Sequence, residues 1–370
     1  MNISILGAGN AGCAIAADLT MKGHEVTLIK TSHAMHDDNF EYLLSNNGRM
    51  TLDEFGAVKT AHIHRVTRDV GEISGSEIVI ILIQTNFHEQ LIYRIAPFLK
   101  DGHILLINPG YLSTAYVLKH CKKEVVVAEA ESSFIDGRIM RPGYFRVGFR
   151  NVRNPIGIYP KVKREQAIQS LNQLDERLVY LGSVVEAALH NPNLIVHTVG
   201  AVMSIPRIEA SGGEFCMYHE AYTRDNPHTW KVLDALDTEK MNVLERFGFK
   251  RVSYVDACKY RNSMDKTIDA KEVFLNYAEM PTRAKGPTQV DSRYISEDVP
   301  QGLVMLESLG KALGVATPVC TALIEIASAA LGRNMRDEGR TLEHLGIENT
   351  NILLKDCGKE QEKTDTIDVE

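Results

Sequence analysis

Hydrophobic residues follow two different patterns along the chain, and the change falls near its middle. Before about residue 160, short runs rich in β-branched residues alternate with stretches in which apolar residues recur at helical spacing. The stretch at residues 76–84 contains the continuous apolar run IVIILI, which is typical of a parallel strand covered on both faces. This alternation predicts a parallel sheet with right-handed crossovers. The stretch at residues 143–160 is expected to add antiparallel strands at its edge.

Long helical patterns dominate the second half of the chain. They occupy residues 165–178, 185–205, 229–247 and 302–331. The sequence therefore predicts an α/β domain followed by an all-α C-terminal domain. The expected division is an α/β domain over residues 1–184, a helical domain over residues 185–346 and a polar C-terminal tail over residues 347–370.

The composition is that of an ordinary globular protein. The chain has 370 residues, so about two domains are expected, and its net charge of -7 argues against an electrostatic footprint for nucleic acid. Its six cysteines lie far apart without CxxC spacing, so the sequence signals neither a zinc site nor a disulfide framework. Free cysteines suit a reducing cytoplasm. No apolar run is long enough to span a membrane, so we expect a cytoplasmic protein without a membrane or nucleic-acid partner.

A glycine-rich sequence follows the first expected strand and opens the first expected helix. It consists of Gly7, Ala8, Gly9, Asn10, Ala11 and Gly12. In a dinucleotide-binding site the first glycine permits a tight turn, the second lets the backbone approach the pyrophosphate, and the third lets the helix pack close to the strand. A glycine-rich turn that binds no nucleotide is the alternative. The position between strand and helix favours a Rossmann fold, a doubly wound parallel sheet that binds NAD or NADP at a helix N-terminus.

The end of the second expected strand bears on which dinucleotide binds. An acidic residue there would bind the ribose 2′-hydroxyl of NAD, but the sequence places Lys30, Thr31 and Ser32 at this point. A cation and two hydroxyls suit the 2′-phosphate of NADP, so NADP is favoured over NAD. The alternative is that Asp37 or Asp38 folds back towards the same position.

A further contact with the cofactor is expected at Asn108. This residue ends a later expected strand and is followed by Pro109 and Gly110. Because cofactors bind at the carboxyl edge of such sheets, we expect the backbone at Asn108 to contact the dinucleotide.

The stretch at residues 190–200, HNPNLIVHTVG, is apolar except at a few helical positions. Asn193 and His197 are four residues apart, so they share one face of a helix. A histidine satisfied inside a hydrophobic core would explain His197 without any chemistry. Histidine is also the side chain best suited to proton transfer near neutral pH. The stretch alone leaves both interpretations open.

The segment at residues 280–300 is rich in proline, glycine and charge, and it predicts a long loop inside the helical half. Arg293 lies five residues before Asp298, and a helix is expected to begin near Pro300. Acidic residues before a helix also stabilise its positive end, so Asp298 needs no chemical role to be explained there. Arg293 could likewise be an ordinary surface residue.

Four stretches together resemble the octopine/nopaline (opine) dehydrogenase family, which joins a Rossmann domain to a helical domain similar to that of 6-phosphogluconate dehydrogenases. They are GAGNAG, APFLKDGHILLINPG, NPNLIVHT, and SRYISEDVPQGLV with LGKALGVATP. They are spread along nearly the whole chain. The resemblance implies that His197 is the catalytic histidine, that Asp298 partners it, that Arg293 helps to hold a substrate carboxylate, and that Asn193 lies in the substrate site.

The same resemblance implies an NAD(P)-dependent dehydrogenase that joins an amino acid to a 2-oxo acid, or catalyses the reverse oxidation. The region at residues 211–285, which should shape the amino-acid pocket, offers no residue that can be matched. Two other functions remain open: a reductase of 2-oxo or hydroxy acids on the same scaffold, which would use a catalytic lysine, and a dinucleotide sensor without activity. We expect small-molecule substrates as partners and leave a homodimer open.

Overall fold

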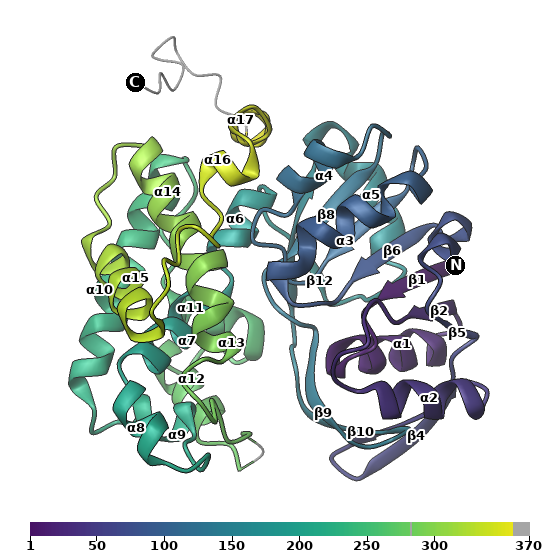
Figure 1. Ribbon diagram of the computed structural model, residues 1–370, viewed down its shortest axis with the longest axis horizontal. Helices are drawn as coiled ribbons and strands as arrows, with labels where there is room; N and C mark the ends of the chain where they lie inside the picture. The colour runs from purple at the N-terminus through teal and green to yellow at the C-terminus, as the bar shows by residue number, and fades with distance from the viewer. Residues whose placement is uncertain (282, 358–370) are drawn as a thin grey trace. The chain divides into compact units, whose positions relative to one another are not determined.

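The computed structural model describes residues 1–281 and 283–357. Contacts divide the chain into two compact units, Met1–Ala187 and Ala188–Glu370. The first unit is an α/β domain and the second is helical (Figure 1), so the fold class predicted from the sequence is confirmed.

An eight-stranded sheet forms the centre of the first unit, in the order β12-β11-β8-β7-β6-β1-β2-β5. Its strands are β1 (Asn2–Leu6), β2 (Glu25–Ile29), β5 (Arg65–Thr67), β6 (Ile78–Ile81), β7 (Ile104–Ile107), β8 (Val126–Ala130), β11 (Asn154–Tyr159) and β12 (Leu178–Tyr180). The six strands from β5 to β8 are parallel and follow the doubly wound order of a dinucleotide-binding domain. Only β11 runs antiparallel to its neighbour β8.

The helices of the first unit connect these strands. They are α1 (Asn10–Met21), α2 (Asp37–Ser45), α3 (His88–Ile95), α4 (Thr114–His120) and α5 (Arg164–Leu171), with short 3₁₀ turns at Val70–Gly75, Thr85–Phe87, Ala96–Phe98 and Lys161–Lys163. The helix expected over residues 165–178 is shorter than predicted, because the chain leaves α5 after Leu171 and enters β12 at Leu178.

The expectation that residues 143–160 add antiparallel strands at the edge of the main sheet is confirmed for β11 and wrong for the preceding strand, which belongs to a second, four-stranded sheet. It has the order β4-β3-β10-β9 and comprises β3 (Arg49–Glu54), β4 (Ala57–His62), β9 (Ile135–Arg141) and β10 (Tyr144–Arg150). Strands β9 and β10 curve away from the main sheet and pass beneath α1 (Figure 1). Helix α1 packs against β2 on one side and against β3, β4, β9 and β10 on the other, which explains why nearly all its residues are small or apolar.

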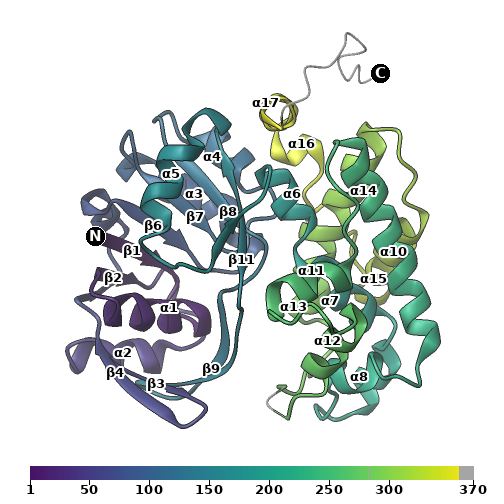
Figure 2. The ribbon, with the colours of Figure 1, turned by 180° about the vertical axis from the view of Figure 1, so that it is seen from behind.

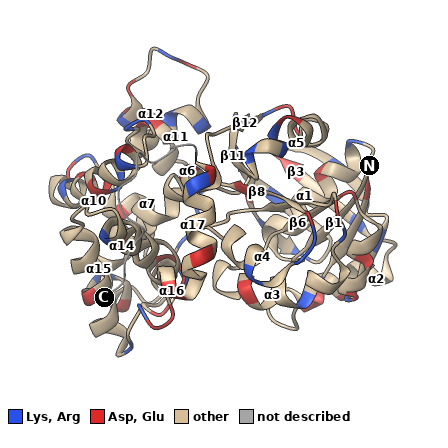
Figure 3. Ribbon diagram, turned by 90° about the horizontal axis from the view of Figure 1, so that it is seen from above, with Lys and Arg blue, Asp and Glu red and all other residues tan. Residues whose placement is uncertain are grey.

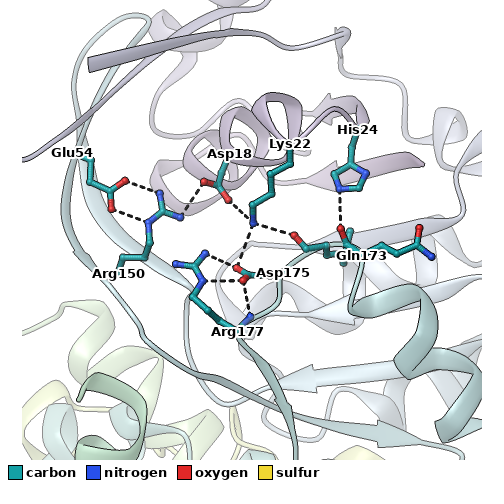
Figure 4. A network of polar contacts seen from close by, with 9 residues as sticks. Asp18, Lys22, His24, Glu54, Arg150, Gln173, Asp175 and Arg177 are labelled. Atoms are coloured by element: carbon teal, nitrogen blue, oxygen red, sulfur yellow. Dashed lines mark hydrogen bonds and ion pairs between the residues drawn. The ribbon is translucent and has the colours of Figure 1, made fainter. Parts of the chain in front are cut away.

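Ion pairs fasten the polar positions of α1 to its surroundings (Figure 4). The guanidinium of Arg150 in β10 binds both carboxylate oxygens of Glu54, at 2.8 and 3.0 Å, and Asp18 of α1 at 3.0 Å. One turn later, the ammonium of Lys22 lies 3.2 Å from Asp18 and 3.6 Å from Asp175, which precedes β12. These ion pairs hold the C-terminal half of the helix that follows the glycine-rich turn.

Helix α7 (Pro192–Val202) is the central helix of the second unit, and its residues from Leu194 to Val202 are all buried. It contacts the helices α8 (Ile205–Ala210), α9 (Met217–Ala221), α10 (Pro227–Arg246), α11 (Tyr254–Asn262), α13 (Arg293–Ser296) and α15 (Pro318–Leu331). Figures 1 and 2 show α7 enclosed among these helices, which explains why it is apolar on every face. The remaining helices are α6 (Val184–Leu189), α12 (Ala270–Ala278), α14 (Val304–Ala312), α16 (Leu342–Leu345) and α17 (Ile347–Asp356).

Prolines break two helices that the pattern predicted to be continuous. The stretch at residues 185–205 forms α6 and α7, because Pro192 begins a new helix and the side chain of Asn191 caps it by accepting the N–H of Asn193 at 3.0 Å. The stretch at residues 302–331 divides in the same way at Pro318. The expected polar tail also needs correction, because α17 occupies its beginning and buries Leu353; residues 358–370 lie outside the described residues.

Charged residues of both signs are interspersed along the described ribbon of each unit (Figure 3). Within the described residues, no helix combines the length and the apolar character needed to cross a membrane. Nor do the side chains of these residues form a group of three or more histidines, cysteines or carboxylates that could hold a metal ion.

Buried His190 should make the helical unit less stable in acid. Burial, followed by the positive charges of Lys240 and Arg261, lowers the pKa of its imidazole from 6.5 to about 3. Below pH 6.5 the unfolded chain therefore binds a proton that the folded chain does not, and the free energy of unfolding should fall by up to about 1.4 kcal/mol per pH unit.

Urea unfolding at several pH values between about 5 and 7 measures this effect. His190→Gln should flatten the dependence relative to the native chain, whereas the same change at His228, exposed at the start of α10, should leave it unaltered. Equal slopes for His190→Gln and the native chain would contradict the assignment.

Candidate active site

The glycine-rich turn between β1 and α1 has the geometry that a dinucleotide requires. Gly7 adopts a φ of +118°, and a Cβ there would lie 2.3 Å from the carbonyl oxygen of Leu82. A Cβ on Gly12 would lie 1.7 Å from the carbonyl oxygen of Gly7, so the helix can approach the strand only without a side chain. A Cβ on Gly9 would meet nothing within 4 Å. Gly7 and Gly12 are therefore needed for packing, while Gly9 faces open space at the N-terminus of α1, as approach by a pyrophosphate demands.

The other members of the sequence GAGNAG have different roles. Ala8 is buried, and Ala11 packs against the hydrophobic core. The side chain of Asn10 accepts the backbone N–H of Ile139 at 2.8 Å and so ties the turn to β9. The side chain of Asn10 is therefore a structural link, and its backbone remains at the helix N-terminus.

The structure gives Lys30 a role that the sequence did not suggest. Its side chain is only 5% exposed, and its ammonium donates to the carbonyl of Met35 at 2.7 Å and lies 3.3 Å from the carboxylate of Asp37. The loop after β2 thus brings Asp37 back towards the end of the strand, which is the alternative that the sequence left open. Lys30 orders the loop after β2, and its charge is balanced before any ligand binds.

Two arginines that the sequence reasoning missed reach the same place. Arg94 of α3 donates to the carbonyl of Thr31 at 3.1 Å, and Arg68, just after β5, donates to the carbonyl of Ser32 at 3.0 Å. Arg68 also binds Asp37 at 3.2 Å. Neither arginine is near Thr31 in the sequence; the parallel order of β2 and β5 and the placement of α3 bring them there, so spacing could not reveal them.

Asn108 lies at the carboxyl edge of the sheet, as expected. Its backbone N–H donates to the carbonyl of Ile81, and its side chain is 2% exposed. Among the described residues, neither the Oδ1 nor the Nδ2 atom of Asn108 has a hydrogen-bond partner. A buried amide without partners is costly, and the side chain, rather than the expected backbone, is therefore the part suited to a polar ligand.

The second unit brings His197 and Asp298 together although 101 residues separate them. The Nδ1 atom of His197 lies 2.8 Å from Oδ2 of Asp298, and the two side chains are 11% and 1% exposed. A single π-helical turn, Val299–Leu303, follows Asp298 directly and contains Pro300. Such turns are irregular and often occur at functional sites, and this one places the carboxylate against α7.

The remaining residues expected in this site lie on α7 and on α13, which packs against α7. Asn193 is half-buried one turn before His197 on α7. Arg293 begins α13; its side chain is 49% exposed and lies 3.2 Å from the buried carboxylate of Glu297. Tyr294, which the sequence reasoning missed, packs its ring on the imidazole of His197, with 4.1 Å between the centroids and 38° between the planes.

The geometry bears on the two interpretations left open for His197. The histidine is buried and satisfied, as a core residue would be, but its partner is an almost fully buried carboxylate. Burying a carboxylate costs more free energy than a neutral partner would, so an apolar or amide residue would serve a purely structural role better. The arrangement fixes one imidazole tautomer and leaves Nε2 as the second proton site, which favours the chemical interpretation.

Comparisons with known proteins agree with both halves of this description. Residues 180–331 match the family described as NAD/NADP octopine/nopaline dehydrogenase, alpha-helical domain, and residues 3–133 match the family described as ketopantoate reductase PanE/ApbA. An opine dehydrogenase of Arthrobacter sp. (strain 1C) is 26% identical over 93% of this chain and 94% of its own. The protein ocs of Agrobacterium tumefaciens (strain Ach5) is 22% identical over 94% and 96%.

Solved structures show the same fold. An octopine dehydrogenase solved with NADH and pyruvate has a TM-score of 0.73 and 16% identity, covering 99% of this chain and 100% of its own. A yersinopine dehydrogenase solved with NADP+ has a TM-score of 0.67 and 13% identity, covering 96% and 98%. The resemblance found in the sequence is confirmed: the helical unit matches the octopine/nopaline dehydrogenase family, and the chain is an NAD(P)-dependent oxidoreductase.

Substitution of two glycines should separate cofactor binding from folding. Gly9→Ala places a methyl group in open space, so the thermal stability of the protein without ligand should be unchanged, whereas the dissociation constants of NADH and NADPH should rise about tenfold or more. Gly12→Ala cannot be accommodated beside Gly7 and should lower the melting temperature. Calorimetric titration and thermal unfolding measure both effects, and unchanged binding by Gly9→Ala would place the pyrophosphate elsewhere.

Proposed function

We propose that the chain catalyses the reductive condensation of an amino acid with a 2-oxo acid, or the reverse oxidation, with His197 as the proton-transfer residue. The observation that carries this proposal is the 2.8 Å contact of His197 with Asp298 inside the segment that matches the octopine/nopaline dehydrogenase helical domain. His197 lies on α7 and Asp298 before the π-helical turn, so one rigid unit holds both groups.

The reaction needs protons to move in two opposite directions. An amino acid binds mostly as its ammonium form, and the Nε2 atom of His197 accepts one proton to free the amine. The amine forms a C–N bond to the carbonyl carbon of the 2-oxo acid, and the imidazolium gives its proton to the carbonyl oxygen. The histidine then carries a second proton from the nitrogen to the same oxygen, which leaves as water and gives a protonated C=N bond. Bound NAD(P)H supplies the hydride that reduces the C=N bond to the secondary amine. The histidine ends in its starting state, as a catalyst must.

Asp298 supports both steps of this proton transfer. By accepting the Nδ1–H of His197, it holds the tautomer whose Nε2 atom is free to act as a base. Once Nε2 is protonated, the buried carboxylate stabilises the imidazolium, and the interaction is strong because so little water surrounds the pair.

Arg293 and Asn193 supply polar contacts for the substrates. The guanidinium of Arg293 is half-exposed and lies 3.2 Å from the carboxylate of Glu297, and its planar group of N–H donors is of the kind that binds a carboxylate. Asn193 offers an amide one turn before His197 on the same helix face. We assign Arg293 to the carboxylate of the 2-oxo acid and Asn193 to the positioning of the substrate beside the imidazole.

A reductase of 2-oxo acids is the second candidate, because residues 3–133 match the ketopantoate reductase family. That match lies in the cofactor domain, which many dehydrogenases share. Such reductases commonly rely on a lysine in the helical domain, but α7 carries His197 at the corresponding place. The buried Lys240 of α10 is ion-paired with Asp237 at 2.6 Å.

We infer that NADP is preferred over NAD. The support is the pair Arg94 and Arg68, whose guanidiniums lie at the carbonyls of Thr31 and Ser32, next to the place of the adenosine ribose in this fold. Arg94 is exposed and makes no ion pair with a carboxylate of the described residues, whereas Arg68 binds Asp37. Arg94 together with the hydroxyls of Thr31 and Ser32 would therefore receive a 2′-phosphate.

Removal of the imidazole should abolish most of the turnover without unfolding the protein. His197→Ala should lower kcat by roughly 10²–10⁴ while the affinity for NADPH stays within about threefold, since general acid–base catalysis typically contributes that much. Asp298→Asn should have a similar effect, and the double variant should be little worse than either single one, because the pair acts as a unit.

His219→Ala, a change at an exposed histidine of the same unit, is the control and should keep native kcat. Steady-state kinetics, with melting temperatures of each variant, give the answer. Near-native turnover of His197→Ala at saturating substrates would restore the core-histidine interpretation.

Cofactor preference should follow the cations at the end of β2. The native chain should bind NADPH more tightly than NADH, and Arg94→Gln should raise the dissociation constant of NADPH about tenfold while leaving that of NADH unchanged. Thr31→Asp should narrow or reverse the preference by repelling the 2′-phosphate. Lys59→Gln removes an exposed charge from β4 and serves as the control. A native preference for NADH of about tenfold would exclude this inference.

A further inference from the structure

A wall of aromatic side chains extends from the imidazole of His197. Its first member is Tyr294, whose ring packs on that imidazole at 4.1 Å. The other end of this tyrosine reaches Gly286, because a Cβ there would lie 3.9 Å from the Tyr294 hydroxyl oxygen. Gly286 in turn pairs with Cys216 in an isolated bridge, and its carbonyl accepts the N–H of Met217. Tyr294 therefore connects the catalytic histidine to the start of α9.

Helix α9 approaches α7 closely on the face that carries His197. Gly200 lies three residues after His197, and a Cβ there would stand 2.8 Å from the side chain of Met217 and 2.8 Å from Tyr222. The absence of a side chain at Gly200 thus lets α9 pack closely against α7. Tyr218 follows Met217 directly and is placed by this packing.

Tyr218, Tyr277 and Arg283 form a compact group beyond Tyr294. The rings of Tyr218 and Tyr277 meet edge to face, with 5.6 Å between the centroids and 86° between the planes. The guanidinium carbon of Arg283 lies 4.0 Å from the centroid of Tyr277 and 5.7 Å from that of Tyr218. All three side chains are partly exposed. Burial raises the pKa of the Tyr218 hydroxyl well above 10, so this hydroxyl stays neutral and can donate a hydrogen bond.

We propose that Tyr294, Tyr218, Tyr277 and Arg283 receive the side chain of the amino-acid substrate, and that this side chain ends in a carboxylate. The inference rests on the proposed function and adds the class of amino acid to it. Flat tyrosine rings suit the methylene groups of a side chain, and the guanidinium at the far end of the wall suits a carboxylate, which it can bind with two parallel hydrogen bonds.

The charge of Arg283 decides against other amino acids. A lysine or arginine substrate would bring a second cation to the faces of Tyr218 and Tyr277 that Arg283 already occupies, and like charges repel. A purely apolar side chain would offer the guanidinium no hydrogen-bond acceptor. Arg293, on α13, is the separate cation already assigned to the carboxylate of the 2-oxo acid, so that carboxylate and the side-chain carboxylate of the amino acid do not compete for one site.

The native enzyme tests this proposal directly with a panel of amino acids. Glutamate, aspartate, glutamine, leucine and arginine are each paired with pyruvate or 2-oxoglutarate, and the oxidation of NADPH and NADH is followed. The expected result is a kcat/KM for glutamate or aspartate at least about tenfold above that for leucine or glutamine and about a hundredfold above that for arginine. Preference for leucine, glutamine or arginine would overturn the assignment of these residues to an acidic side chain and leave the proposed function intact. Failure of every amino acid to support oxidation would instead overturn the proposed function.

Substitutions at Arg283 and Lys285 then test which residue is responsible for the preference for an acidic amino acid. Arg283→Gln should raise KM for the acidic amino acid about tenfold or more, leave its kcat within about threefold, and leave KM for glutamine unchanged. Arg283→Lys keeps the charge but loses the planar guanidinium. Its KM for the acidic amino acid should lie between that of the native enzyme and that of Arg283→Gln. Lys285→Gln removes a charge two residues away that is paired with Glu214, and it should change neither constant. An equal rise in KM for glutamate and glutamine, or an equal effect of Lys285→Gln, would overturn the assignment to Arg283. Should Arg283→Gln not fold, the substrate panel on the native chain decides alone.

Discussion

The hydrogen bond between His197 and Asp298 is the interaction on which the account of this protein depends. It joins the central helix of the second unit to a segment 101 residues later, and it does so with a carboxylate that is almost fully removed from water. Such a group is tolerated only when it is paired, so the surrounding helices must hold both partners in register. The break at Pro192, which starts α7, and the π-helical turn after Asp298 are the two local irregularities that give this register.

The two units contribute different parts of the chemistry. The first carries a glycine-rich turn whose backbone is shaped for a pyrophosphate, and this feature is shared by many enzymes with unrelated substrates. The second carries the pair that we propose for proton transfer and the tyrosines and arginines that we propose for substrate binding. The residues proposed to determine the type of reaction therefore lie mainly in the helical unit. This agrees with the match of that unit to the octopine/nopaline dehydrogenase helical domain.

The sequence predicted the fold class and, through the family resemblance, the pairing of His197 with Asp298 better than it predicted the surroundings of the site. Period-two and helical patterns, with glycines at fixed spacing, depend on neighbouring residues, so the strand order near β1 and the shared helix face of Asn193 and His197 could be anticipated. The separate sheet of β9 and β10 could not, because strands that leave one sheet for another keep the same alternation.

The residues around the site depend on contacts between distant segments. Arg94 reaches Thr31, and Tyr294 packs on His197, only because the folded chain brings them together. Lys30 shows the opposite error: its position at the end of β2 suggested a ligand contact, yet the nearby carbonyls and Asp37 satisfy its charge. Sequence spacing locates a cation but does not tell which group it binds.

The identity of the product tests the central claim most directly. The enzyme is incubated with an amino acid, a 2-oxo acid and NADPH carrying deuterium at the transferable position, and the products are analysed by mass spectrometry. The account predicts a secondary amine whose mass is the sum of the two acids less one water and plus two hydrogens, one of them deuterium on the carbon next to nitrogen. Formation of only a deuterated 2-hydroxy acid, with the amino acid unchanged, would show that the chain reduces carbonyl groups and would contradict the account.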